Sequence, residues 1–138
     1  MNAVEIEEAV SALMAEPFDK AEFPYQFLAA FGFKDTTIRK LRAGASATSD
    51  VPGAVLLRSN IHLAVAEPGK TSEAIKALKA SPKTTKGKVK FVLATDGAMV
   101  EAEELASGDI RACPYAEVPK HFGFFLSAKA NRLPYSGH

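Results

Sequence analysis

An apolar segment that leads through a charged loop into a helix constrains the fold of this chain most. Residues 61–66 read Ile-His-Leu-Ala-Val-Ala, and a loop with Glu67 and Lys70 follows before a helical pattern begins. In α/β proteins such a strand end is where ligands bind and where chemistry usually takes place. We therefore expect an α/β domain whose site region lies around these two charged residues.

Residues 1–44 predict a layer of three helices. The first carries an apolar face made of Val4, Ile6, Val10, Leu13 and Met14. A second helix fits residues 24–31, which begin with a proline and precede a glycine. Thr36 or Thr37 can cap a third helix that stops at Gly44.

Residues 53–115 predict the sheet core. Strands are expected at residues 53–58, 61–66, 88–95, 99–105 and 110–115. The turn at residues 59–60 makes the first two strands antiparallel. Asp96-Gly97 is expected as a two-residue hairpin turn, because glycine accepts the positive φ that such turns require.

One helix is expected between the second and third strands. Thr71 can cap it, and Ile75 and Leu78 face inward, with Pro82 following its end. The predicted order is β-β-α-β-β-β behind an N-terminal helical layer. This is an α/β fold with a mixed β-sheet and flanking helices.

Length and composition predict one domain. The chain has 138 residues, of which 47% are hydrophobic and 24% charged, with a net charge of +1, as in ordinary cytoplasmic globular proteins. Residues 1–126 are expected to form the domain and residues 127–138 a disordered tail. No apolar run reaches the length of a membrane span, and the acidic N-terminus is no secretory signal.

A metal-dependent nuclease is one interpretation of the charged loop. Such an enzyme needs carboxylates on adjacent strands to hold Mg²⁺ and a lysine to stabilise developing charge. Asp50, Glu67 and Lys70 come nearest to that set. An acid and a lysine two residues apart on one strand face would be expected, but this strand offers Val65 and Glu67. The alternative is that the three residues are plain surface charges.

Lysines concentrate in residues 70–90, where Glu73 is the single acidic residue. Lys76, Lys79 and Lys83 fall at helical spacing and are expected to be solvated. Glu101, Glu103 and Glu104 are expected to balance the charge elsewhere on the surface. The residues predicted to contact DNA phosphates are Lys76, Lys79, Lys83, Lys86 and Lys88. A solvated helix face with a flexible loop explains the same pattern.

The loop at residues 69–71, the histidine at position 62 and the single cysteine do not predict a binding or catalytic site. Gly69-Lys70-Thr71 lacks the earlier glycine of a phosphate-binding loop, since that position is Ala64. His62 is expected to be a structural or surface residue. The single cysteine, Cys113, excludes an internal disulfide and a cysteine-based zinc site, and no metal site is expected.

Several short segments occur in an order that resembles a known family. They are Tyr25-Gln-Phe-Leu-Ala-Ala-Phe-Gly32, Thr37-Ile-Arg-Lys-Leu41, Gly53-Ala-Val-Leu-Leu, Ile61-His-Leu-Ala-Val, Lys90-Phe-Val-Leu-Ala-Thr-Asp-Gly97 and Phe122-Gly-Phe-Phe125. Over roughly residues 1–126 the chain resembles the N-terminal domain of MmeI-like type II restriction–modification DNA methyltransferases.

The resemblance implies a restriction-endonuclease-like core in a bacterial protein. The family's acid plus Glu-x-Lys set cuts DNA, whereas the matching strand here offers Val65-Ala-Glu67. The resemblance also implies a methyltransferase domain with an S-adenosylmethionine site, and no such motif occurs in this chain. A truncated or stand-alone remnant is therefore expected.

The predicted function is a catalytically degenerate, DNA-associated domain that positions or regulates a methyltransferase in cis or in trans. It would bind DNA weakly, without sequence preference and without a cofactor of its own. A weak Mg²⁺-dependent endonuclease and a protein-interaction module are the alternatives.

Overall fold

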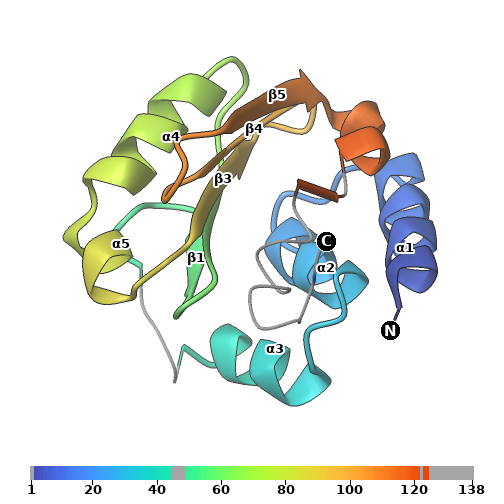
Figure 1. The fold of residues 1–138 in the computed structure, drawn as a ribbon, viewed down its shortest axis with the longest axis horizontal. Helices are drawn as coiled ribbons and strands as arrows, with labels where there is room; N and C mark the ends of the chain where they lie inside the picture. The colour runs from blue at the N-terminus through green and yellow to red at the C-terminus, as the bar shows by residue number, and fades with distance from the viewer. Residues whose placement is uncertain (1, 45–48, 122, 125–138) are drawn as a thin grey trace.

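A five-stranded mixed sheet forms the centre of the computed structural model, which describes residues 2–44, 49–121 and 123–124 (Figure 1). The strands, in both spatial and chain order, are β1 (Ala54–Leu57), β2 (Ile61–Val65), β3 (Phe91–Thr95), β4 (Met99–Glu104) and β5 (Ile110–Pro114). β2 and β3 run parallel, and every other neighbouring pair is antiparallel. The predicted α/β class with a mixed sheet is thereby confirmed.

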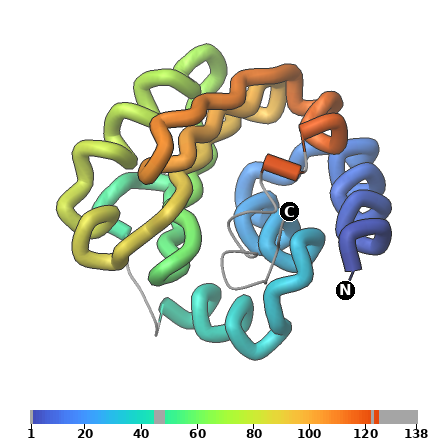
Figure 2. Tube along the Cα trace, viewed as in Figure 1, coloured from blue at the N-terminus to red at the C-terminus, as the bar shows by residue number. Residues whose placement is uncertain are grey.

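One face of the sheet is covered by the N-terminal helices and the C-terminal 3-10 helix. These elements are α1 (Ala3–Ala15), α2 (Phe23–Ala30), α3 (Asp35–Arg42) and η1 (Tyr115–His121). Figure 2 shows the blue and cyan N-terminal helices on one side of the sheet, opposite the green and yellow segment that follows β2. Alternate strand residues, among them Leu63 and Leu93, pack into this larger core.

The other face is covered by α4 (Thr71–Ala80), with α5 (Pro82–Lys86) following it. Ile75 and Leu78 of α4 pack on the intervening strand residues Ala64, Val92 and Ala94. The parallel pairing of β2 with β3 requires such a crossover, because a tight turn can join only antiparallel strands. The inward orientation predicted for the two α4 residues is confirmed.

The first and third helices differ in detail from the predicted ones. Asn2 and Glu5 form a reciprocal capping box that starts α1, and Val4 is 63% exposed rather than part of its buried face. α3 begins at Asp35 without a side-chain cap, so Thr36 and Thr37 lie inside the helix. The predicted threonine caps were wrong because the cap position is Lys34, two residues before Thr36.

The segment between α4 and β3 contains a helix that the sequence pattern did not predict. Pro82 ends α4 and also starts α5, because the Ser81 side chain accepts a hydrogen bond from the backbone N–H of Lys83. β3 consequently begins at Phe91 and not at Lys88, which has a φ of 53°.

The β3–β4 hairpin is confirmed, but its turn is longer than predicted. Thr95 pairs with Val100, so residues 96–99 separate the last paired positions. Gly97 has a φ of 91°, and the Asp96 side chain accepts hydrogen bonds from two later backbone N–H groups. A two-residue Asp96-Gly97 turn was therefore wrong, although both residues shape the bend.

The predicted tail, residues 127–138, and two residues of the motif at 122–125 lie outside the described residues. None of the helices in the described part of the chain has the length and apolar character needed to cross a bilayer.

Candidate functional site

A groove of about 560 Å³ lies at the carboxyl end of β2, where the sequence predicted the site region. Its charged lining comes from Lys20, ahead of α2, and from Glu67, Lys70 and Glu73 in the loop and first turn of α4. The sheet contributes Val65 and neighbouring small residues to its floor. The groove thus brings Glu67 and Lys70 together, as predicted.

The four charged side chains of the groove form two ion pairs. Lys20 Nζ lies 2.8 Å from Glu67 Oε2, and Lys70 Nζ lies 3.6 Å from Glu73 Oε2. The hydrogen bond and the positive charge of Lys20 lower the pKa of Glu67. All four side chains are more than half exposed, so each pair stabilises the fold little. Their charges cancel, and the groove offers no net charge to an anion or a cation.

Asp96 ties the loop after β2 to the turn after β3. Its Oδ2 accepts a hydrogen bond of 2.9 Å from Gly69 N, and its Oδ1 accepts bonds from Ala98 N and Met99 N. Burial acts to raise the pKa of Asp96, but these backbone donors outweigh it and lower the pKa. The carboxylate is therefore ionised and committed to backbone N–H groups, which makes it a poor base. Its position before Gly97 was the only sequence signal for this role.

Asp50 does not line the groove, although the next residue, Val51, does, and its carboxylate is bonded at the far end of α4. Its Oδ1 accepts a hydrogen bond of 2.6 Å from Ser81 Oγ at the far end of that helix, whereas Glu67 and Lys70 lie at its start. Ten helical residues span about 15 Å. In the described part of the chain, no three His, Cys, Asp or Glu side chains gather into a possible metal site. The predicted trio of Asp50, Glu67 and Lys70 is therefore not assembled.

His62 is fully buried on the α4 face of β2 and joins two distant segments. Its Nε2 lies 2.6 Å from Ser49 Oγ, and its Nδ1 lies 2.8 Å from Thr84 Oγ1. Thr84 donates its only hydroxyl proton to Leu78 O, so it must accept from Nδ1–H, and Nε2 must accept from Ser49. Burial lowers the pKa of His62, and the negative charge of Asp50 opposes this only in part. The predicted structural role fits this buried network.

Cys113 is also buried, and burial together with Glu117 raises the pKa of its thiol. Because the thiolate is the nucleophilic form of cysteine, this residue is an inert part of the core.

The predicted DNA-contacting lysines occupy three elements. Lys76 and Lys79 lie on α4, Lys83 and Lys86 on α5, and Lys88 in the segment before β3. Lys79 Nζ is 2.8 Å from Glu103 Oε1, and that carboxylate is largely buried. Lys79 is thus exposed, as expected, but its charge is paired, and Glu103 does not lie elsewhere on the surface as expected. The two residues pair because β4 also packs against α4.

Thr71 is the first residue of α4 and not its cap. Lys70 occupies the cap position, and the buried Oγ1 of Thr71 has no hydrogen-bond partner among the described residues. An unpaired buried hydroxyl costs about 1–3 kcal/mol of desolvation free energy.

We therefore expect Thr71→Val, which keeps the shape and removes the hydroxyl, to raise the free energy of unfolding by about 1 kcal/mol. Urea denaturation followed by circular dichroism measures this change. Thr84→Val is the matched control, and it should lose stability because that hydroxyl bonds His62 and Leu78 O. A loss of stability in Thr71→Val would show that its hydroxyl is bonded.

Comparison with known proteins identifies the family to which this sequence is similar. Residues 1–135 match the family model described as "MmeI, N-terminal domain". DNA methyltransferase A of Bacillus subtilis (strain 168) is 23% identical over 129 residues, which cover 94% of this chain. The chain spans about 15% of the length of that curated relative. No solved structure matches the chain.

Proposed function

This chain belongs to the family of MmeI N-terminal domains, and from that premise we propose that it is a DNA-associated domain of a restriction–modification DNA methyltransferase. Its role would be to position or regulate a catalytic domain present in cis or in trans. The similarity to DNA methyltransferase A supports this role, because nearly all of this chain matches a small part of that longer protein. S-adenosylmethionine would be bound by the catalytic domain and not by this chain.

We assign the core of the domain to the restriction-endonuclease-like class as part of the same proposal. A mixed sheet with helices on both faces and charged residues at the carboxyl end of a central strand is what we expect of such a core. The parallel pair β2–β3 would correspond to its centre.

We propose that the domain does not cut DNA, because its candidate carboxylates lie too far apart to share a metal ion. A magnesium site requires several oxygen ligands at one point. Glu67 is paired with Lys20, Asp96 is held by backbone N–H groups, and Asp50 lies at the other end of α4. β2 itself presents no acidic side chain. The domain would therefore act by binding, although the full methyltransferase remains an enzyme.

Association with DNA is tested by fluorescence anisotropy with short labelled duplexes of unrelated sequence. We expect weak binding at low salt that differs little between duplexes and falls steeply as salt is raised. The reason is that lysine contacts with phosphates release counterions and do not read base edges. If the wild-type protein does not bind the duplexes at low salt, the proposal fails, and the alternative function as a protein-interaction module takes its place.

The absence of cleavage is tested by incubating the protein with supercoiled plasmid and Mg²⁺ or Mn²⁺. We expect the plasmid to remain intact over hours, in the wild type and in Glu67→Ala alike. Lys20→Ala is the matched control, since it frees Glu67 from its ion pair without removing the carboxylate. Cleavage by the wild type that disappears in Glu67→Ala would establish a metal-dependent endonuclease instead.

A further inference from the structure

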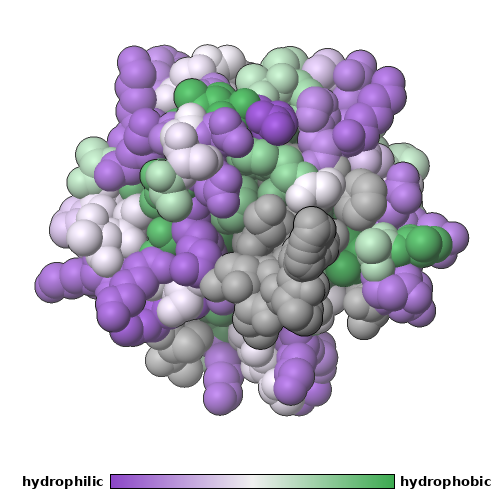
Figure 3. All heavy atoms as spheres, viewed as in Figure 1, coloured by the Kyte–Doolittle hydropathy of each residue, from purple (hydrophilic) through white to green (hydrophobic). Residues whose placement is uncertain are grey.

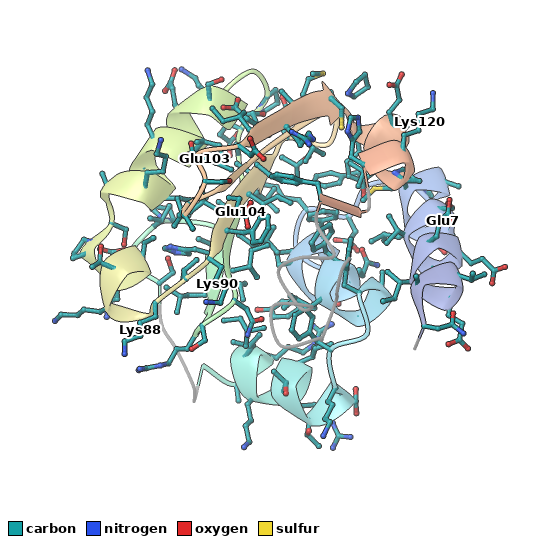
Figure 4. The ribbon with its side chains drawn as sticks, in the orientation of Figure 1. Glu7, Lys88, Lys90, Glu103, Glu104 and Lys120 are labelled. Carbon is teal, nitrogen blue, oxygen red and sulfur yellow. The ribbon has the colours of Figure 1, made fainter. Side chains whose placement is uncertain are left out.

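A cluster of basic side chains lies at the end of the sheet opposite the groove. We define this amino-end surface by Arg58, Lys83, Lys86, Lys88 and Lys90, all of which are exposed. Two backbone hydrogen bonds join its segments, from Ser59 N to Gly87 O at 2.7 Å and from Lys90 N to Asn60 O at 2.9 Å. Figure 4 shows Lys88 beside α5 and Lys90 nearer the strands, and Glu104, which pairs with Phe91 between β3 and β4, lies at the same end of the sheet. Residues far apart in the sequence thus form one fixed surface.

The basic side chains of the amino-end surface outnumber the acidic side chains beside it. Within the described residues, none of its five basic side chains forms an ion pair, and the salt bridges all involve other basic residues. Two acidic residues border it. Asp50 accepts a hydrogen bond from Ser81, and Glu104 accepts one from Ser107. Figure 3 shows hydrophilic side chains gathered at the lower left, where Figure 1 places α5. A polyanion would meet several free cations here, in contrast to the neutral groove.

Lys88, in the amino-end surface, has a positive backbone φ, which residues other than glycine seldom adopt. Lys88 N donates to Thr85 O and Val89 N donates to Thr84 O, which is the Schellman ending of a helix. The residue in the left-handed conformation of that motif is usually glycine, but here it is lysine with a φ of 53°. Ser59, with a φ of 66°, is the other non-glycine residue of positive φ in the described chain, and it belongs to the same joined segments. Such unfavoured conformations concentrate where a side chain serves a function.

We propose that the sugar–phosphate backbone of duplex DNA lies on the amino-end surface, with Lys88 among the side chains that contact phosphates. This inference rests on the proposed function and specifies which surface carries it. It moves the contact away from the α4 lysines, since Lys79 is paired with Glu103. Arg58 joins the surface from outside the lysine-rich segment, and Lys90 joins it although it belonged to that segment without being among the predicted contacts.

The first test compares two doubly substituted variants of equal charge. Lys86→Gln with Lys90→Gln removes two charges from the amino-end surface. Lys76→Gln with Lys120→Gln removes two exposed charges, on α4 and η1, that pair with no acidic side chain in the described part of the chain. We expect the first variant to bind a short duplex about tenfold more weakly and to reduce the slope of log affinity against log salt by about two. The second variant should bind like the wild type.

The outcomes separate this inference from the proposed function. If the wild type binds and both variants bind equally well, the amino-end surface is wrong while DNA association stands. If the wild type does not bind any duplex at low salt, DNA association itself fails, and this surface fails with it. Binding to anionic lipid vesicles without binding to DNA would likewise contradict both DNA association and this surface.

The second test uses Lys88 to separate stability from binding. Lys88→Gly should raise the melting temperature by about 2–4 °C, because glycine adopts a positive φ without strain. The same change should weaken DNA binding about threefold, because it removes one phosphate contact. Lys88→Asn is the control, since asparagine tolerates this conformation and also lacks the charge. Wild-type DNA affinity in both variants would overturn the role of Lys88.

Discussion

Gly97→Val is expected to lower the free energy of unfolding by about 2–5 kcal/mol, which combines backbone strain with a steric clash. Gly97 has a φ of 91°, and a Cβ at this position would lie 2.7 Å from a ring carbon of Phe18. Phe18 cannot move aside easily, because its ring packs against Phe23 and Tyr115 at centroid distances of 5.5 and 5.4 Å. Urea denaturation of the two proteins measures the difference.

Gly108→Val is the matched control for this prediction. Gly108 also has a positive φ, 77°, but a Cβ there would meet no atom within 4 Å. The control should therefore show only the backbone cost of about 1–3 kcal/mol. Equal losses in the two variants would mean that the Phe18 contact contributes nothing.

His62 is expected to make the stability of the fold depend on pH between 7.5 and 5.5. Burial holds the pKa of the folded residue below its ordinary value of 6.5, so the ring stays neutral in the fold. As the pH falls below 6.5, the unfolded chain takes up a proton that the folded chain does not. Stability is then lost until the folded pKa is reached, at up to about 1.4 kcal/mol per pH unit. Stability is thus greatest above the unfolded pKa.

The measurement is urea denaturation of the wild type and of His62→Leu at several pH values. At pH 7.5 the variant should be about 1–3 kcal/mol less stable, because Ser49 and Thr84 lose their hydrogen bonds to the ring. Its stability should fall less than that of the wild type as the pH is lowered to 5.5. His121→Leu, at the partly exposed end of η1, is the control and should retain the wild-type pH dependence. An identical pH dependence in His62→Leu would remove His62 as the cause.

The parts of the fold that depend on neighbours in the sequence could be predicted. The buried strands β2 and β3 are short apolar runs, and the hairpin after β3 is marked by Asp96 and Gly97. α5 was missed because a proline after a helix was interpreted only as a stop, whereas Ser81 makes the same proline a start. The membership in the MmeI family was also predictable, since the order of short motifs survives where single motifs are not specific.

The candidate site depended on contacts that no local pattern contains. Ser49 and Thr84 lie 13 and 22 positions from His62, and Lys79 lies 24 positions from Glu103. The pairing of Lys20 with Glu67 bridges 47 positions. Such partners decide whether a charged side chain is free to bind a ligand. Charge and spacing alone selected Lys70 and Lys79, which form ion pairs, and missed Arg58, which forms none within the described residues.

The order of the strands in the sheet has a consequence for how the chain folds. Each strand pairs with its neighbour in the sequence, and the β3–β4–β5 meander closes through short turns. Among the described strands, β2 and β3 are the one pair that must wait for a helix to form between them. The packing of α1 against η1, by contrast, joins the first helix to the 3-10 helix that follows β5 (Figure 1). Local contacts form rapidly and distant ones slowly, so we expect the meander to form first and the α1–η1 seam to close last.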